Sequence, residues 1–280
     1  MTQTPNISFE FFPPKNMEAT FGLFETVQAL HKLDPSFVSV TYGAGGTTRE
    51  LTHDAVGLLG RKFGLNVAAH LTCVDATKEE TMAIAQGYAD AGVTEIVALR
   101  GDPPKGVGAF TAHPDGFANS VELIEALAQT GKFKLRVGAY PDPHPEAADS
   151  NADIQWLKQK FEAGADSAIT QFFFDPDNFF RFRDRAEKAG ITGKIIPGIL
   201  PIVSWKGARK FAESCGTPIP AHLDEAYAKE GVDAHQLSVD LATDMCEKLL
   251  AGGVEDLHFY TLNRPALSRD ICANLGVATS

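Results

Sequence analysis

Residues 66–100 read NVAAHLTCVDATKEETMAIAQGYADAGVTEIVALR, and they contain the structural unit that recurs through the chain. The two ends of this stretch are short and rich in apolar residues, which is typical of buried strands. Between them, residues 78–91 have the apolar spacing of a helix, and Thr77 with Glu80 resembles a capping box at its start. A strand, a helix and a second strand in this order favour parallel pairing of the two strands.

The same alternation extends over nearly all of the 280 residues. Besides residues 66–72 and 94–100, the strand candidates are residues 7–12, 36–42, 134–140, 167–173, 194–200 and 256–262. The other helical patterns cover residues 17–33, 49–63, 120–130, 152–163 and 177–189, helical stretches between 204 and 250, and a final helix at 265–275. Four helical patterns are followed by a glycine where a left-handed C-cap residue is expected, at Gly92, Gly131, Gly164 and Gly190.

Eight strands that alternate with helices favour a closed barrel over an open doubly wound sheet. The first strand is not followed by the Gly-x-Gly-x-x-Gly pattern of a dinucleotide-binding sheet, and no linker divides the chain. We therefore predict an α/β fold, a single (β/α)8 TIM-type barrel with extra helices before and after strand eight. Residues 1–280 are expected to form one catalytic domain.

The composition excludes several classes of protein. A formal net charge of −11 repels polyanions, which argues against nucleic acid as a partner. No apolar run approaches the roughly 20 residues of a membrane span, and the N-terminus does not resemble a signal peptide. We therefore expect a cytoplasmic enzyme. The four cysteines are widely spaced, which predicts reduced thiols, and no recognised ligand spacing predicts a metal site.

The active site of such a barrel lies at the C-terminal ends of the strands, so polar residues there are the first candidates. They are Glu10, Thr41, Tyr42, His70, Arg100, Gly101, Asp102, Tyr140, Gln171, Tyr260, Thr261, Asn263 and Arg264. Converging polar groups without a metal shell suggest a planar, hydrogen-bonding ligand such as a flavin or a pterin.

Three of the charged candidates have two interpretations each. Glu10 interrupts an apolar strand, where loss of water should raise its pKa and suit it to act as a general acid; alternatively it forms a buried ion pair, for instance with Arg264. Asp102 is a catalytic loop carboxylate or a turn residue. Lys160 could meet phosphate groups or simply be a solvated surface lysine.

Taken together, these residues resemble the methylenetetrahydrofolate reductase family from about residue 7 to residue 277. The motifs that carry the resemblance are SFEFFPPK from Ser8, FVSVTYGA from Phe37, HLTC from His70, IVALRGD from Ile96, AYPDPHPEA from Ala139, ITQFFFD from Ile169, IIPGILP from Ile195 and FYTLNR from Phe259. The resemblance implies an oxidoreductase of one-carbon metabolism and methionine biosynthesis. NADH or NADPH would reduce bound FAD, which would then reduce 5,10-methylenetetrahydrofolate to 5-methyltetrahydrofolate by a ping-pong mechanism. A homo-oligomer is also implied.

The resemblance assigns roles to individual positions. Glu10 matches the general acid, and Asp102 matches a carboxylate near both the flavin and the pterin. Gln171, Phe211 and Arg264 match folate-site residues. The FAD positions carried over are Thr41, Tyr42, Ala44, His70, Arg100, Gly101, Asp102, Phe117, Ala118, Tyr140, His144, Ala147, Asp153 and Lys160, with Thr41 nearer the nicotinamide. The chain departs from the family pattern at Phe117, Trp156, Gln159 and Gly207, mainly on the adenine and phosphate side.

Two other functions remain open at this point. The departures at the FAD positions motivate a flavin-free version of the same barrel, in which hydride passes directly from nicotinamide to the folate. A folate- or flavin-binding module without catalysis is the second alternative, and a proline-oxidising flavin barrel is a more distant analogy of fold alone. The sequence does not distinguish NADH from NADPH.

Overall fold

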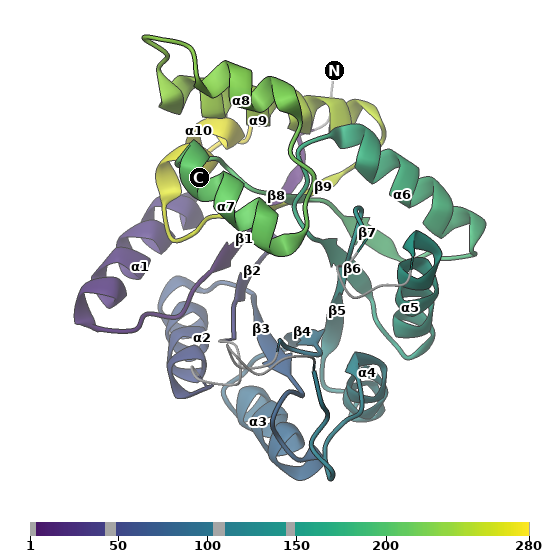
Figure 1. The fold of residues 1–280 in the computed structure, drawn as a ribbon. Coiled ribbons are helices and arrows are strands. Elements are labelled where there is room, and N and C mark those ends of the chain that lie inside the picture. Colours follow the sequence, from purple (N-terminus) through teal and green to yellow (C-terminus); the bar gives the residue numbers. More distant parts are fainter. Residues whose placement is uncertain (1–3, 43–48, 103–109, 144–148, 280) are drawn as a thin grey trace.

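Parallel strands and outer helices alternate along the chain in a computed structural model that describes residues 4–42, 49–102, 110–143 and 149–279 (Figure 1). The strands are β1 (Asn6–Phe11), β2 (Phe37–Val40), β3 (Val67–Thr72), β4 (Glu95–Leu99), β5 (Lys134–Ala139), β6 (Ser167–Thr170), β7 (Lys194–Ile196), β8 (Gly198–Ile199) and β9 (Asp256–Tyr260). The helices are α1 (Met17–Leu30), η1 (His31–Leu33), α2 (Arg49–Phe63), α3 (Lys78–Asp90), α4 (Ser120–Gln129), α5 (Ser150–Glu162), α6 (Pro176–Lys188), α7 (Trp205–Cys215), α8 (Ala221–Tyr227), α9 (Ala234–Ala251) and α10 (Pro265–Asn274).

All strand pairs are parallel, in the order β7-β6-β5-β4-β3-β2-β1-β9-β8. The first and last strands of this order, β7 and β8, are neighbours in the chain. Since β7 pairs with β6 and β8 pairs with β9, this stretch of chain joins the two edges of the sheet. Pro197 separates β7 from β8, and proline has no N–H to donate to a ladder. Its carbonyl still accepts a hydrogen bond from the backbone N–H of His258 at 3.0 Å. Residues 194–199 therefore act as one interrupted strand that closes the barrel, as the predicted eight strands require.

Strand residues alternate between two apolar environments. Ile7, Phe9 and Phe11 of β1 belong to the large core between the strands and the helices. A smaller cluster comes from alternate positions of five other strands and consists of Phe37, Ala68, Val97, Ile169 and Ile196. This alternation is the pattern of a barrel whose interior is filled by side chains.

The interior toward the N-terminal ends of the strands is held by a buried ion pair. Arg136 donates to Oε2 of Glu95 at 2.7 Å, and its guanidinium lies 3.6 Å from the ring centroid of Phe37. The Phe37 ring stacks on His258, whose Nδ1 is 2.8 Å from Oγ of Ser8. The Nε2 atom of His258 is buried and has no hydrogen-bond partner among the described residues.

The helix ends agree with the signals in the sequence. Thr77 and Glu80 form the capping box, and Gly92, Gly131 and Gly164 have φ angles of 86°, 62° and 115°. Gly190 is also left-handed, with φ 82°. The extra helices are α8 and α9 before β9 and α10 after it. None of the described helices is both long and apolar enough to span a membrane.

Several predicted strands are too long at their C-terminal ends. The second was expected to reach Tyr42 but ends at Val40, and the sixth was expected to reach Phe173 but ends at Thr170. The extra residues follow the apolar run, but they come after the last register pairs of these strands with β3 and β7, Val40 with Ala69 and Ile169 with Ile196. Apolarity alone does not mark where the ladder stops.

Gly198→Ala should lower the free energy of unfolding by about 1–3 kcal/mol, the usual cost of overpacking. An added Cβ would overlap the carbonyl oxygen of Thr170 and lie 2.5 Å from Cε2 of Tyr260. Urea unfolding followed by circular dichroism measures the change. The matched control is Gly22→Ala inside α1, where a Cβ meets nothing within 4 Å; it should stabilise by about 0.5–1 kcal/mol. Equal effects of the two substitutions would contradict the close packing at Gly198.

Candidate functional site

Glu10 lies on β1, on the strand face that points into the barrel, near the C-terminal ends of the strands. Its side chain is 16% exposed, and its described partners are Ser39 and His70. The Ser39 hydroxyl donates to Oε2 of Glu10 at 3.5 Å from the neighbouring position on β2. Burial raises the pKa of Glu10 from 4.5 to about 8, and the Ser39 hydrogen bond opposes this shift only in part.

The contact with His70 is not a salt bridge. Nε2 of His70 is 3.4 Å from Oε2 of Glu10, which is within ion-pair distance, but the geometry does not make a hydrogen bond. Burial lowers the pKa of His70 to about 3, so the imidazole is neutral at physiological pH. Arg264, the ion-pair partner considered from the sequence, has an exposed side chain at the start of α10 and is not among the described partners of Glu10. Among the described side chains, no cation lies beside this carboxyl group, so the ion pair considered from the sequence is not found there.

Tyr260 forms the wall next to Glu10. The two residues are register partners on β9 and β1, and the Tyr260 hydroxyl donates to the carbonyl of Thr170 at 2.6 Å. Gly198 leaves the room that the Tyr260 ring fills. Burial raises the pKa of Tyr260 well above its usual value, with the nearby Glu10 charge as a second cause. Tyr260 is therefore a fixed, neutral phenol that keeps water away from one side of the acid.

A second group of polar side chains follows β4 and β5. Lys160 of α5 donates from Nζ to the carbonyl of Gly138 at 2.8 Å. Burial lowers the pKa of Lys160 to about 8; Asp153 acts in the opposite direction, and Arg100 adds to the lowering. Burial also raises the pKa of Tyr140 to about 12, with a contribution from the negative charge of Asp102. Tyr140 and Lys160 therefore both lie within electrostatic range of Arg100 and Asp153, and Tyr140 also lies within range of Asp102.

Lys160 is the clearest correction to the local sequence pattern. A lysine on an outer helix was expected to be solvated unless it met phosphate. Instead, its ammonium group reaches inward to the barrel strand β5, near the Arg100 side chain. The Arg100 charge lowers the pKa of Lys160, and two neighbouring cations suit an anionic ligand such as a diphosphate, which would relieve their repulsion.

Two buried polar atoms of β3 also have no described hydrogen-bond partner. They are Nε2 of His70 and Oγ1 of Thr72, successive inward positions on β3. Gly101 follows with φ 85° and lies so close to Thr72 that a Cβ would be 2.9 Å from the Thr72 Cβ atom. Polar atoms without a partner among the described residues, together with the cations Arg100 and Lys160, fit a planar, hydrogen-bonding cofactor with phosphate groups, as FAD is.

The remaining predicted residues lie in several environments. Thr41 is half-buried and its backbone N–H donates to the carbonyl of Phe11, while Tyr42 is buried. Phe117 packs into the hydrophobic core, with Lys78 5.3 Å from its ring centroid. Ala118 is exposed, and its backbone N–H donates to Glu122. Ala44, His144 and Ala147 lie outside the described residues.

The predicted folate residues are exposed or half-buried, as a substrate surface requires. The Phe211 side chain is 41% exposed and stacks on Phe172, with 5.1 Å between the ring centroids. Gln171 immediately precedes Phe172, and its Oε1 accepts from the Phe172 backbone N–H. Asp102 and Arg264 are exposed. The sequence reasoning missed Ser39, although the register of β1 and β2 and the alternation of strand faces could have placed it beside Glu10.

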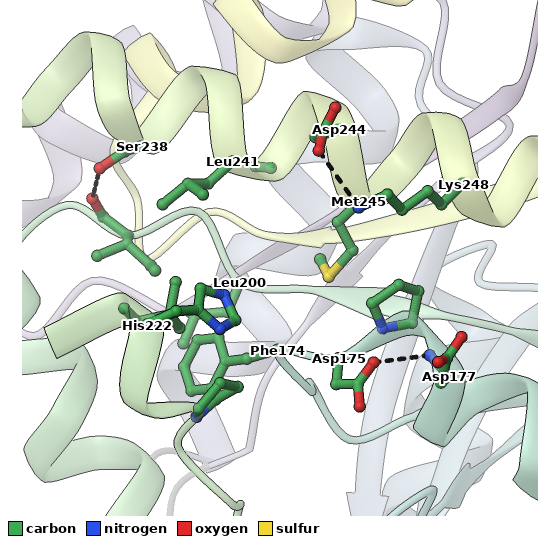
Figure 2. A pocket seen from close by; sticks show the side chains of 15 residues that line it. Phe174, Asp175, Asp177, Leu200, His222, Ser238, Leu241, Asp244, Met245 and Lys248 are labelled. Atoms are coloured by element: carbon green, nitrogen blue, oxygen red, sulfur yellow. Dashed lines mark hydrogen bonds and ion pairs between the residues drawn. The ribbon is translucent and has the colours of Figure 1, made fainter. Parts of the chain in front are cut away.

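Figure 2 shows a cavity of about 700 Å³ outside the barrel interior. It lies between α9, which contributes Leu241 and Met245, and a floor that includes Phe174 and Leu200. None of the predicted site residues lines it. We place the candidate active site at the C-terminal ends of the barrel strands instead, because the desolvated acid and the two cations lie there. Among the described residues, no three His, Cys, Asp or Glu side chains gather as a metal site would require.

Comparison with known proteins gives a consistent result. The family model for methylenetetrahydrofolate reductase matches residues 1–276. The 5,10-methylenetetrahydrofolate reductase of Escherichia coli (strain K12) is 45% identical over 275 residues, which cover 97% of this chain and 91% of that protein. A probable methylenetetrahydrofolate reductase (NADH) of Oryza sativa subsp. japonica is 37% identical over 286 residues, which cover 96% of this chain and 48% of the rice protein.

Among solved structures, an uncharacterized protein from Clostridium thermocellum that binds two copies of 5-methyl-5,6,7,8-tetrahydrofolic acid has a TM-score of 0.63. Its sequence is 14% identical, and the match covers 98% of this chain and 94% of that one, so the likeness concerns the fold. The family model and the E. coli relative, by contrast, match in sequence over nearly the whole chain. The chain belongs to the methylenetetrahydrofolate reductase family.

Proposed function

We propose that the protein catalyses the reduction of 5,10-methylenetetrahydrofolate to 5-methyltetrahydrofolate, with FAD as cofactor and NADH or NADPH as electron source, in two alternating half-reactions. The observation that carries this proposal is the carboxyl group of Glu10, which is desolvated beside neutral partners. A pKa of about 8 keeps it protonated at neutral pH, as a general acid must be. Membership of the family supports the substrate.

Glu10 is the proposed proton donor to N10 of the folate. As the proton arrives, the bond between N10 and the bridging methylene carbon breaks, and its electron pair stays on N10. The carbon is left as an iminium at N5, which a hydride converts to the methyl group. Glu10 then regains its proton from solvent, so each turnover consumes one hydride and one proton.

FAD, when bound, supplies the hydride chemistry that links the two substrates. We assign its phosphate groups to Arg100 and Lys160, because the Arg100 charge acts on Lys160, whose ammonium group reaches inward to the Gly138 carbonyl. His70 and Thr72 supply unpaired polar atoms for its ring system. The other proposed cofactor contacts are Thr41, Tyr42, Ala44, Gly101, Asp102, Phe117, Ala118, Tyr140, His144, Ala147 and Asp153.

The folate and the nicotinamide would share the open side of the site. We propose that Asp102 stabilises positive charge on the folate, that Gln171 and Arg264 hydrogen-bond to it, and that Phe211 stacks on it. The exposure of Phe211 and Arg264 supports this assignment. The name of the rice relative favours NADH over NADPH. A single catalytic domain and a homo-oligomer remain predictions.

The purified protein should show flavin absorption bands, since the site fits a bound flavin. The bands should bleach when NADH is added without oxygen and return when 5,10-methylenetetrahydrofolate follows. An absorption spectrometer under anaerobic conditions measures both steps. A colourless protein that does not take up FAD but reduces the folate would instead support direct hydride transfer, and one that only binds folate would support a non-catalytic module.

Glu10→Gln should slow reoxidation of the flavin by the folate about 10²- to 10⁴-fold, the usual contribution of a general acid. Bleaching by NADH needs no such proton donor and should change less than twofold. Stopped-flow absorbance measures the two half-reactions separately, so the NADH reaction is the control within the same variant. Equal losses in both half-reactions would refute the assignment of Glu10 as proton donor.

Glu10 should also make stability depend on pH. Because its pKa is raised from 4.5 to about 8 in the folded state, the folded protein keeps a proton that the unfolded chain loses between these values. Stability is therefore lost as pH rises through this window. The free energy of unfolding of Glu10→Gln, relative to the unchanged protein, should increase by up to about 1.4 kcal/mol per pH unit from pH 5 to 8.

Urea unfolding at four pH values checks this slope. Glu25→Gln, at an exposed position in the middle of α1, is the control and should show no comparable slope. A flat difference for Glu10→Gln would mean that Glu10 is ionised in the folded protein at neutral pH.

A further inference from the structure

The chain makes an unusual turn directly after β9. Leu262 and Asn263 have φ angles of 51° and 53°, so two consecutive residues other than glycine adopt left-handed conformations. Side chains with a Cβ rarely adopt this conformation, and such strain persists where surrounding contacts enforce it. The contacts of this turn are therefore informative.

The turn binds the end of β1 through side chains. The Phe12 backbone N–H donates to Oδ1 of Asn263 at 2.9 Å, and Nδ2 of Asn263 donates to the Phe12 carbonyl at 3.0 Å. The Thr261 hydroxyl donates to the carbonyl of Glu10 at 2.6 Å and accepts from the backbone N–H of Asn263 at 3.1 Å. The last register pair of β1 and β9 is Glu10 with Tyr260. Beyond it, the side-chain amide of Asn263 makes the hydrogen bonds to β1 that the backbone of a strand residue would otherwise make.

The turn is held from behind as well. The hydroxyl of Thr26, a buried residue of α1, shares its one proton between the Gly22 carbonyl at 2.8 Å and the Asn263 carbonyl at 2.9 Å. On the opposite edge of β1, the backbone N–H of Thr41 donates to the Phe11 carbonyl at 3.0 Å. Residues 10–12 are consequently fixed on both sides, at the point where the Glu10 side chain enters the site.

We propose that residues 261–263 are a positioning latch that holds the Glu10 carboxyl group in place for proton transfer to the folate, with Asn263 as the positioning residue. The inference rests on the proposed function. Asn263 acts through the backbone of residues 10–12 and not by touching the reacting atoms. The same turn leads directly into Arg264, so the proton donor and the proposed folate arginine belong to one rigid unit.

The groups that face Glu10 do not depend on the amide of Asn263. They are Ser39 on β2, the neutral His70 on β3 and the phenol of Tyr260 on β9, with Tyr140 and Cys215 near Tyr260. If the latch is released, these groups stay while residues 10–12 gain freedom. The Glu10 carboxyl group then hydrates more readily, and its pKa falls toward the ordinary value.

Asn263→Gly tests the latch, because glycine tolerates the left-handed backbone while both side-chain hydrogen bonds are lost. Reoxidation of the flavin by the folate should slow about 10- to 100-fold, as expected for a misplaced catalytic group, and bleaching by NADH should change less than twofold. The apparent pKa of the folate half-reaction should fall by about one unit. Stopped-flow absorbance across pH 6–9 measures these quantities.

The matched control is Asp34→Gly. Asp34 is also left-handed, with φ 50°, but it precedes β2 and so lies at the opposite end of the barrel. It should leave both half-reactions and the pH profile unchanged. If Asn263→Gly behaves like this control, or if it slows both half-reactions equally, the latch is refuted.

Should Asn263→Gly fail to fold, Asn263→Asp, which keeps the acceptor for Phe12 and loses the donor, should show the same losses to a smaller extent.

A second readout needs neither cofactor nor substrate. The free energy of unfolding with and without Glu10→Gln, measured across pH, gives the upper pH at which the contribution of Glu10 stops changing. In Asn263→Gly this pH should be lower by about one unit, and an unchanged value would overturn the latch. If the unchanged protein shows neither half-reaction, the proposed function fails while this measurement still decides the latch.

Discussion

Closure of the barrel at residues 194–199 is the constraint on which the site depends. The interrupted strand joins β6 to β9 around Pro197, and only this closure places Tyr260 between β1 and the strand that carries Gly198. Glu10 is thereby surrounded by Ser39, His70 and Tyr260. An open sheet would leave the same carboxyl group exposed to water on one side, with an ordinary pKa.

Glu95 and Glu10 both lie in the barrel interior, but their surroundings differ. Glu95 is paired with a cation, since Arg136 lies 2.6 Å away, and Asn66 also donates a hydrogen bond to it. Glu10 has no cation beside it in the part of the chain that the structure describes, and burial favours its neutral form. A buried pair of this kind mainly avoids the cost of an unpaired charge, whereas an unpaired acid retains a proton to donate. The stability and the chemistry of the barrel are thus separated along its axis, with the ion pair toward the N-terminal ends of the strands and the acid toward the other.

Two cations, Arg100 and Lys160, lie at the C-terminal ends of the strands. Arg100 follows a strand end and Lys160 lies on an outer helix, yet the Arg100 charge affects the pKa of both Lys160 and Tyr140. Repulsion between the two cations is unfavourable without an anion, which gives a physical reason for the site to bind one. The acid, the cations and the latch are held by different elements, so each can be altered without removing the others.

The sequence by itself determined the alternation of strands and helices, the helix ends at Thr77 and Gly92, and the family through its motifs, because these depend on neighbouring residues. Periodicity therefore predicted most of the fold, and the motifs nominated Glu10 before its surroundings were known. Only the tertiary structure decided what those residues meet: Ser39 and not Arg264 beside Glu10, Lys160 turned inward, and Asn263 bonded to Phe12. These contacts join residues as far as 251 positions apart, and the closure that brings them together leaves no periodic signal in the chain.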